Sequence, residues 1–260
     1  MNNKHLFLDI GNTAIDCLYV DNLKGIYEKY PLAKKDTLRG SILSHYNEES
    51  FDVYISSVNL KASAFIRNIL DDSGIKYHFL DSKKMETYSK ENNYTIKNVS
   101  FLGSDLFCDI IAKDNIDGLI IIDLGTATKV LFIDSNNVFH GCSILPGILS
   151  FPKSLFNDTS LLGDYPLIEK PPLVSLKTEE CISSGAIYGT CYAVKGIVEK
   201  LLETNKNAKI YITGGNAFYI DEHLSIPNKT IIKEPYLVLK GIIKAFGFKN
   251  IENISISKED

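Results

Sequence analysis

The chain has 260 residues, and its 28 basic and 32 acidic side chains give a formal net charge of −4. This mild acidity argues against a main role in nucleic-acid binding, which usually needs a basic surface. No apolar run approaches the roughly 20 residues of a membrane span, and the apolar residues after Lys4 are too few for a signal peptide. Five scattered cysteines without a C-x-x-C pair indicate neither a zinc site nor a disulfide framework. We therefore expect a cytoplasmic protein of one large or two modest domains, without nucleic acid or membrane as partner.

The first half of the chain has the pattern of a mixed α/β domain. An apolar strand at 5–9 and an alternating strand at 15–20 flank a polar turn, which is typical of a β-hairpin. The spacing of apolar residues predicts helices over 36–46 and 61–70, with strands at 51–55 and 77–80. A further helix is expected over 103–113.

The same pattern then starts again. Strands are expected at 118–122, 129–133 and 138–144, and Pro146-Gly147 opens a helix. A long helix is predicted over 178–202, with Thr178 as its candidate N-cap. A strand at 208–212 ends in Thr213-Gly214-Gly215, and the last helix covers 235–246.

The polar turns of the two predicted hairpins correspond to one another. Residues 8–14, Leu-Asp-Ile-Gly-Asn-Thr-Ala, match residues 122–128, Ile-Asp-Leu-Gly-Thr-Ala-Thr, with an offset of 114. Such an internal repeat predicts two domains of related topology, 1–116 and 117–260, with a ligand in the cleft between them.

These turns have the composition of a nucleotide site. Glycine lets the backbone approach a phosphate, turn amides bind its oxygens, and Thr13 and Thr126 add hydroxyl donors. Asp9 and Asp123 would hold Mg²⁺ or another cation, directly or through water. Gly214 and Gly215 would leave room for a flat adenosine. An isolated Asp-x-Gly is a common turn, but two copies in matched contexts favour phosphoryl transfer.

The ordered motifs resemble type III pantothenate kinases, within the superfamily of acetate and sugar kinases, heat-shock chaperones and actin. They are Asp9 to Thr13, Gly103-Ser104-Asp105, Asp123 to Thr128, Gly141-x-x-Ile144-x-Pro146-Gly147, Thr178-x₆-Gly185 and Thr213-Gly214-Gly215. The resemblance implies an α/β protein of two ribonuclease H-like domains. It also implies a homodimer that phosphorylates pantothenate with ATP, Mg²⁺ and a monovalent cation in the first step of coenzyme A synthesis.

The resemblance also implies roles for single residues. Asp105 would be the general base, although Gly-Ser-Asp also suits a helix cap. Asp123 would bind K⁺ or NH₄⁺, and Asp9 would bind Mg²⁺. The ATP contacts would be Asp9, Ile10, Gly11, Asn12, Thr13, Ala14, Ile15, Asp16 and Thr126, beside the adenosine site at Gly214 and Gly215. The substrate contacts, at the dimer interface, would be Gly103, Ser104, Asp105, Leu106 and, from the partner subunit, Thr178.

The match fails mainly on the substrate side. Leu106 stands where the family has an arginine for the substrate carboxylate, Ile96 where it has a tyrosine, and Val99 where it has a proline. Two alternatives therefore stay open: a kinase for another small alcohol, and a non-catalytic nucleotide-binding subunit, regulatory or part of a heterodimer. Lys129, at a threonine position, either restores a cation near the phosphates or the substrate carboxylate, or is a solvated strand-edge lysine, which the pattern favours.

Overall fold

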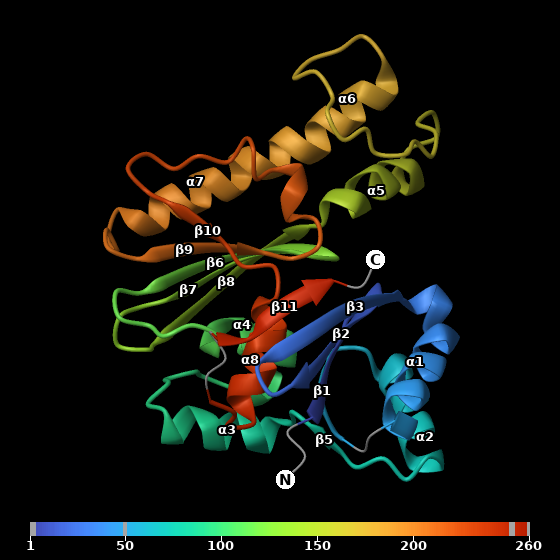
Figure 1. Cartoon of the computed structure of the whole chain (residues 1–260). Helices are drawn as coiled ribbons and strands as arrows, with labels where there is room; N and C mark the ends of the chain where they lie inside the picture. The colour runs from blue at the N-terminus through green and yellow to red at the C-terminus, as the bar shows by residue number, and fades with distance from the viewer. Residues whose placement is uncertain (1–3, 49–50, 250–252, 259–260) are drawn as a thin grey trace. The chain divides into compact units, whose positions relative to one another are not determined.

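The computed structural model describes residues 4–48, 51–249 and 253–258, which form two compact units. The first unit comprises Met1–Asp114 and Leu237–Asp260, and the second comprises Asn115–Tyr236 (Figure 1). The division after Asp114 lies near the expected boundary, but the C-terminal segment belongs to the first unit. The physical reason is that helix α8 (Leu237–Ala245) packs against helix α4 (Ser104–Ile111), β1 and β4 of that unit.

A six-stranded mixed sheet organises the first unit, in the order β11-β3-β2-β1-β4-β5. β1, β2 and β3 form an antiparallel meander, and β4 and β5 continue the sheet parallel to β1. The bounds are β1 (Lys4–Ile10), β2 (Ala14–Asp21), β3 (Lys24–Pro31), β4 (Asp52–Ser57), β5 (Tyr77–Phe79) and β11 (Ser255–Lys258). The sequence patterns predicted four of these strands and missed β3 and β11.

Helices pack on the first sheet because its strands are apolar on both faces. α1 (Lys35–Glu48) and α2 (Leu60–Asp72) bury Leu38, Ile42 and Ile66 against apolar side chains of β1, β2 and β4. α8 and α4 contribute the remaining cover, and α3 (Ser82–Glu91), which was not predicted, packs beside α8. None of the described helices is long and apolar enough to cross a membrane.

The second unit repeats the topology of the first. Its sheet has the order β10-β9-β6-β7-β8, in which β6, β7 and β8 are antiparallel neighbours and β9 and β10 run parallel to β6. The bounds are β6 (Leu119–Leu124), β7 (Ala127–Ile133), β8 (Phe139–Pro146), β9 (Lys209–Thr213) and β10 (Ile231–Lys233). This duplicated strand order confirms the ribonuclease H-like fold expected from the repeated turn motif.

One long helical rod packs on the second sheet through its C-terminal part (Figure 1). It consists of α6 (Thr178–Ser184), a π-helical segment (Gly185–Gly189) and α7 (Thr190–Leu202), so the extent predicted for the long helix is confirmed. Its predicted cap is wrong: Lys177 occupies the N-cap position without a side-chain cap bond, and Thr178 is the first helical residue. A shorter helix, α5 (Phe151–Asp158), follows β8 through a turn of 3₁₀-helix.

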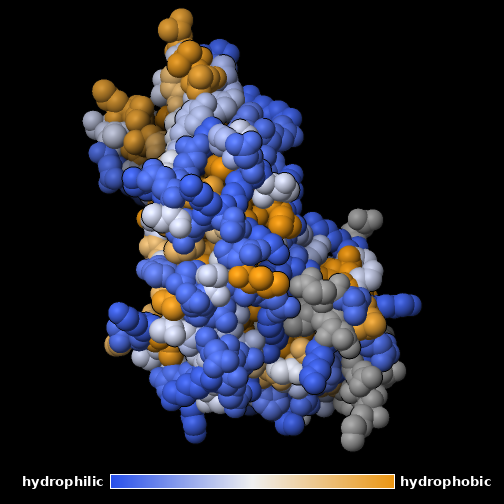
Figure 2. All heavy atoms as spheres, turned by 90° about the vertical axis from the view of Figure 1, so that its left-hand side faces the viewer, coloured by the Kyte–Doolittle hydropathy of each residue, from blue (hydrophilic) through white to orange (hydrophobic). Residues whose placement is uncertain are grey.

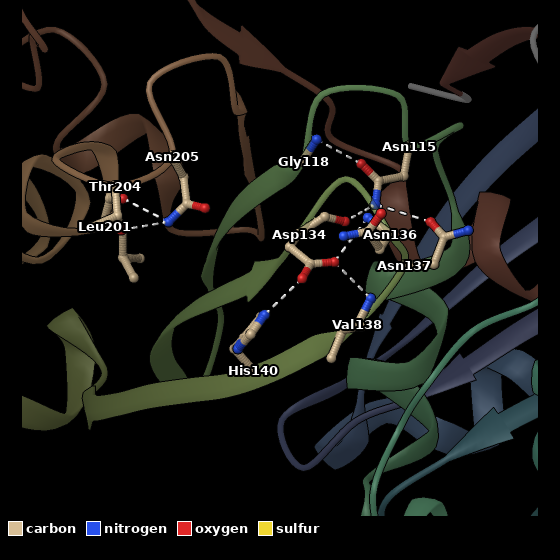
Figure 3. A network of polar contacts seen from close by, with 10 residues as sticks. All are labelled: Asn115, Gly118, Asp134, Asn136, Asn137, Val138, His140, Leu201, Thr204 and Asn205. Carbon is tan, nitrogen blue, oxygen red and sulfur yellow. Dashed lines mark hydrogen bonds and ion pairs between the residues drawn. The ribbon is translucent and has the colours of Figure 1, made fainter.

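A polar network ties the start of β6 to the turn between β7 and β8 (Figure 3). Asn115 donates to the Asp134 carbonyl and to Asn137, and its own Oδ1 accepts from the Gly118 amide at 2.9 Å. The Asp134 carboxylate accepts from the Val138 amide and contacts His140 Nε2 at 3.0 Å. Burial raises the pKa of Asp134, but the bonds from His140 and the backbone amides outweigh it and leave that pKa below its ordinary value.

At the opposite end of β6, two glycines allow later backbone segments to contact the turn between β6 and β7. Gly214 has a φ of +90°, and a Cβ there would lie 2.5 Å from the Leu124 carbonyl carbon. Gly147 approaches the turn in the same way, since a Cβ there would lie 2.8 Å from the Thr126 carbonyl carbon. Only glycine meets both requirements at position 214, the backbone conformation and the contact distance.

We expect Gly214→Ala to lower the free energy of unfolding by about 2 kcal/mol or more, because it adds backbone strain to overpacking. Urea denaturation followed by circular dichroism measures this effect. The matched control is Gly196→Ala in α7, where an added Cβ meets nothing within 4 Å and helix propensity improves by up to about 1 kcal/mol. Equal stability of the two variants would contradict the close-contact interpretation.

Candidate active site

Two carboxylates and a lysine lie on neighbouring strands beside the first turn. Asp9 is the last residue but one of β1, directly opposite Asp16 on β2, which is itself opposite Lys29 on β3. Residues in such register share one face of the sheet. Lys29 Nζ lies 3.1 Å from Asp16 Oδ1, and the Tyr27 hydroxyl donates to the same oxygen. The sequence predicted Asp9 and Asp16 for this site, but not Lys29.

The backbone of the first turn is held by hydrogen bonds from both sides. The Gly11 amide donates to the Ala14 carbonyl at 3.0 Å, and the Leu32 amide donates to the Thr13 carbonyl at 3.0 Å. Asn59, the N-cap of α2, reaches the Gly11 carbonyl through Nδ2 at 3.4 Å. Ile10 and Ile15, expected at the ATP site, have fully buried side chains, so only their backbone could meet a ligand.

The start of α4 is fixed to the same edge of the first sheet. Ser104 is buried, and its hydroxyl bonds to Ser56 Oγ at 2.9 Å and accepts from the Ser57 amide at 3.0 Å. Ser56 is the parallel neighbour of Asp9 in the sheet register. The predicted substrate motif and the first turn therefore meet at the carboxyl ends of β1 and β4.

Asp105 is half-buried in the first turn of α4. Its Oδ1 accepts a hydrogen bond from the Leu106 amide at 2.8 Å. The same oxygen lies 2.5 Å from the position that a Cβ on Gly103 would occupy. Gly103 is the N-cap, without a side-chain cap bond, so Asp105 is not the cap itself. A negative charge in this first turn is nevertheless favourable to the helix dipole.

Three carboxylates lie near the buried thiol of Cys108 in α4. Burial raises the pKa of Cys108 well above its ordinary value, and Asp9, Asp109 and Asp105 raise it further. Asp9 and Asp105 come from segments nearly a hundred residues apart and are brought together within one unit. The structure thus joins the residues that the sequence proposed for phosphate binding and for proton transfer.

The second turn carries an ion pair where the sequence suggested a cation ligand. Asp123 and Lys129 are directly opposite on β6 and β7, and Lys129 Nζ lies 2.7 Å from Asp123 Oδ2. Both side chains are largely buried, with 14% of Lys129 and 9% of Asp123 exposed. Lys129 is therefore not the solvated strand-edge residue that the sequence pattern favoured.

Carbonyl groups of the second turn are bound by side chains and backbone from later segments. Asn216 donates its amide to the Leu124 carbonyl at 2.9 Å and its Nδ2 to the Gly125 carbonyl at 2.8 Å. Ser150 donates to the Thr126 carbonyl at 3.3 Å. The site prediction did not include Asn216 or Ser150, although the position of Asn216 directly after Gly214-Gly215 was a usable signal. These bonds hold Gly214 and Gly215 beside the turn.

The remaining substrate-side residues present mainly apolar surface. Leu106 is half-buried in α4, Ile96 is half-buried, and Val99 is buried. Thr178 is exposed at the start of α6, and its contribution to a site in another subunit stays a prediction. The two turns lie in different units, so the cleft expected between the domains also stays a prediction.

The two expected cations differ in how well these residues fit them. Among the described residues, no group of three or more His, Cys, Asp or Glu side chains forms a metal cage. Mg²⁺ bound with a nucleotide needs only one or two carboxylates besides phosphate oxygens and waters, and Asp9 can supply one, whereas Asp16 already pairs with Lys29. A monovalent ion on Asp123 fits poorly, because the Lys129 ammonium, 2.7 Å from Oδ2, already neutralises the carboxylate.

Comparisons with solved structures identify the fold. A Campylobacter jejuni protein described as a Baf family transcriptional activator superposes with a TM-score of 0.57 at 19% identity, covering 93% of this chain and 96% of that one. MreB5 of Spiroplasma citri bound to ADP superposes with a TM-score of 0.50 at 14% identity, covering 96% and 98%. Identities this low carry no functional statement, but they place both units in the actin-like ATPase fold.

Comparisons of sequence identify the family. The family model described as type III pantothenate kinase matches residues 5–200. The type III pantothenate kinase of Borrelia hermsii is 30% identical over 247 residues, covering 91% of each chain. That of Listeria monocytogenes is 26% identical over 258 residues, covering 91% of this chain and 94% of the relative. Because the family model matches most of the chain and a relative with 30% identity covers 91% of it, the chain belongs to the type III pantothenate kinase family.

Proposed function

We propose that this chain transfers the γ-phosphoryl group of ATP to the primary hydroxyl of pantothenate, the first step of coenzyme A biosynthesis. The observation that carries the proposal is the anchoring of α4 at the end of β4, which brings Asp105 to the strand end that carries Asp9. In this proposal, Asp105 is the proton acceptor and lies near a phosphate-binding turn at one edge of the sheet. Family membership supplies the identity of the two substrates.

In the proposed reaction, Asp105 accepts the hydroxyl proton as the oxygen attacks the γ-phosphorus and ADP leaves. Its carboxylate is oriented by the Leu106 amide and by the Ser104 contacts to β4, so little motion is needed before transfer. Backbone amides at Asn12 and Thr13 and near Thr126 would hold phosphate oxygens. Mg²⁺ bound with ATP, held by Asp9 directly or through water, would supply positive charge to the phosphates.

Adenosine would rest on the backbone at Gly214 and Gly215, which carry no side chains of their own. Binding of a single ATP by the two turns is part of this proposal. So is a cytoplasmic location, for which the scattered spacing of the five cysteines in the sequence is support, because it indicates no disulfide framework.

We expect Asp105→Asn to lower turnover by about 10²–10⁴-fold while ATP affinity and stability change little, because the amide keeps the shape of the side chain but cannot accept the proton. A coupled assay of ADP release gives the turnover, and calorimetry gives the affinity. Asp117→Asn, at an exposed loop position, is the matched control. Full activity of a folded Asp105→Asn protein would overturn the general-base role.

Leu106 is the residue on which substrate choice depends most. An apolar side chain cannot donate to a carboxylate, and loss of one charge-assisted bond costs about 1.5–3 kcal/mol, or roughly 10- to 150-fold in affinity. We expect Leu106→Arg to lower the KM for pantothenate, with a smaller gain for the alcohol analogue that lacks the carboxylate. An equal effect on the two substrates would show that position 106 does not face the carboxylate.

The two alternatives are tested by the same assay with a panel of small alcohols. Activity on another alcohol but not on pantothenate would favour a related kinase. ATP binding without turnover on any alcohol, not rescued by Leu106→Arg, would favour a regulatory subunit or one half of a heterodimer.

A homodimer completes the proposal. Apolar side chains of the second unit are exposed on and between α5 and α6, among them Leu161 at 94% and Val174 at 83%. Figure 2 shows apolar side chains at the top of the view, the end of this unit where Figure 1 draws α5 and α6. Clustered exposed apolar residues are typical of protein interfaces. A second copy covering them would meet Thr178, which the resemblance assigns to the partner's substrate site.

Sedimentation velocity should give twice the 29.0 kDa mass of one chain at micromolar concentration. We expect Val174→Glu to shift the protein toward monomer, because a charge in an apolar interface is costly to desolvate. Leu60→Glu, at the exposed start of α2 in the first unit, is the control and should stay dimeric. A monomeric wild-type protein would contradict the dimer.

A further inference from the structure

A negative charge lies directly beside the second turn. Asp123 Oδ1 is 3.7 Å from the place a Cβ on Gly125 would occupy, so the carboxylate borders the backbone that would receive a phosphate. Two negative charges that close, in a site partly removed from water, repel strongly. The turn can therefore bind phosphate well only if a positive charge stays on Asp123.

The chain supplies this charge itself. Lys129 Nζ lies 2.7 Å from Asp123 Oδ2, and the antiparallel register of β6 and β7 holds the two residues opposite each other. Burial limits both salt screening and exchange with dissolved ions. It also makes the pair hard to break, because separation would leave a buried carboxylate without its counter-charge.

The first unit provides a contrast. Lys29 pairs with Asp16 at 3.1 Å, but 45% of the Lys29 side chain is exposed, so that pair is open to water and salt. The pair in the second unit is short, desolvated and formed between directly paired strand positions. Of the two, only the second has the properties of a permanent charge built into the site.

We propose that the Lys129 ammonium stands permanently in place of a monovalent cation on Asp123, so that the second turn accepts the phosphates of ATP without K⁺ or NH₄⁺. The inference rests on the proposed function only in naming ATP as the ligand. Lys129 acts here as a positioning residue, because it neutralises Asp123 and thereby prepares the turn for phosphate.

The wild-type test compares four salts at equal ionic strength: sodium, potassium, ammonium and choline chloride. We expect the dissociation constant for MgATP, measured by calorimetry without any alcohol, to agree within about twofold across all four, since twofold is only about 0.4 kcal/mol. Turnover and melting temperature in the same salts should be equally flat. A rise of several-fold in affinity or turnover on exchanging choline for K⁺ would overturn the proposal.

Two substitutions at Lys129 distinguish the effect of its ammonium charge from the effect of its side-chain volume. Lys129→Thr removes the ammonium and opens room for an ion, so MgATP affinity should fall about 10-fold in choline chloride and recover in potassium or ammonium chloride. Its melting temperature should also become higher in potassium than in choline. Lys129→Met keeps a long stem, so the same loss should appear without recovery. Lys209→Thr, an exposed lysine of β9 in the same sheet, is the control and should match the wild type.

Unchanged MgATP affinity of Lys129→Thr in choline chloride would overturn the proposal. If that variant does not fold, the affinity of Lys129→Met decides in the same way. Salt-independent ATP binding without phosphorylation of any alcohol would refute the proposed function and leave this inference standing. If turnover of pantothenate requires K⁺, the proposed function stands and this inference is refuted.

Discussion

The antiparallel pairing of β1 with β2, and of β6 with β7, sets the chemistry of both turns. Each pair ends in a tight turn after an aspartate, but the first turn closes from Gly11 to Ala14 and the second from Gly125 to Ala127, one residue earlier. Register then decides which side chain faces the aspartate. Asp9 is opposed by an acid, Asp16, and Asp123 by a base, Lys129. A difference of one residue in turn length therefore accompanies the change from an aspartate opposite a second carboxylate to an aspartate opposite an ammonium group.

The sequence predicted the architecture because its strongest signals repeat. The duplicated turn motif and the apolar strands around it gave both hairpins, and the structure adds that the two sheets share one strand order. The elements that were missed have weak patterns. β3 has only one buried residue between charged and half-buried positions, and α3 buries only three of its ten residues. The C-terminal segment could not be assigned to the first unit from composition, because α8 is apolar enough to pack in either one.

The roles given to the site residues stay predictions, but the structure brings several of the motif residues together. Asp9 lies beside the first turn, and the start of α4, which carries Asp105, is bonded to the end of β4 next to it. The sequence could not predict pairing across strands, so it missed the contact of Lys129 with Asp123 and that of Lys29 with Asp16. It also missed Asn216 and Ser150, which bond to carbonyl groups 91 and 24 residues away. Such partners depend on tertiary packing, and no local pattern encodes them.

The π-helical segment changes the phase between the two α-helical parts of the rod. Buried residues recur along the rod at spacings of three or four positions, at Ser183, Ile187, Thr190, Val194 and Val198. A regular α-helix advances about 100° per residue, so the last of these side chains would lie roughly 60° around from the first. The wider turn at Gly185–Gly189 slows this rotation. The buried side of α6 is thereby brought closer in phase with that of α7, the part of the rod that contacts β7.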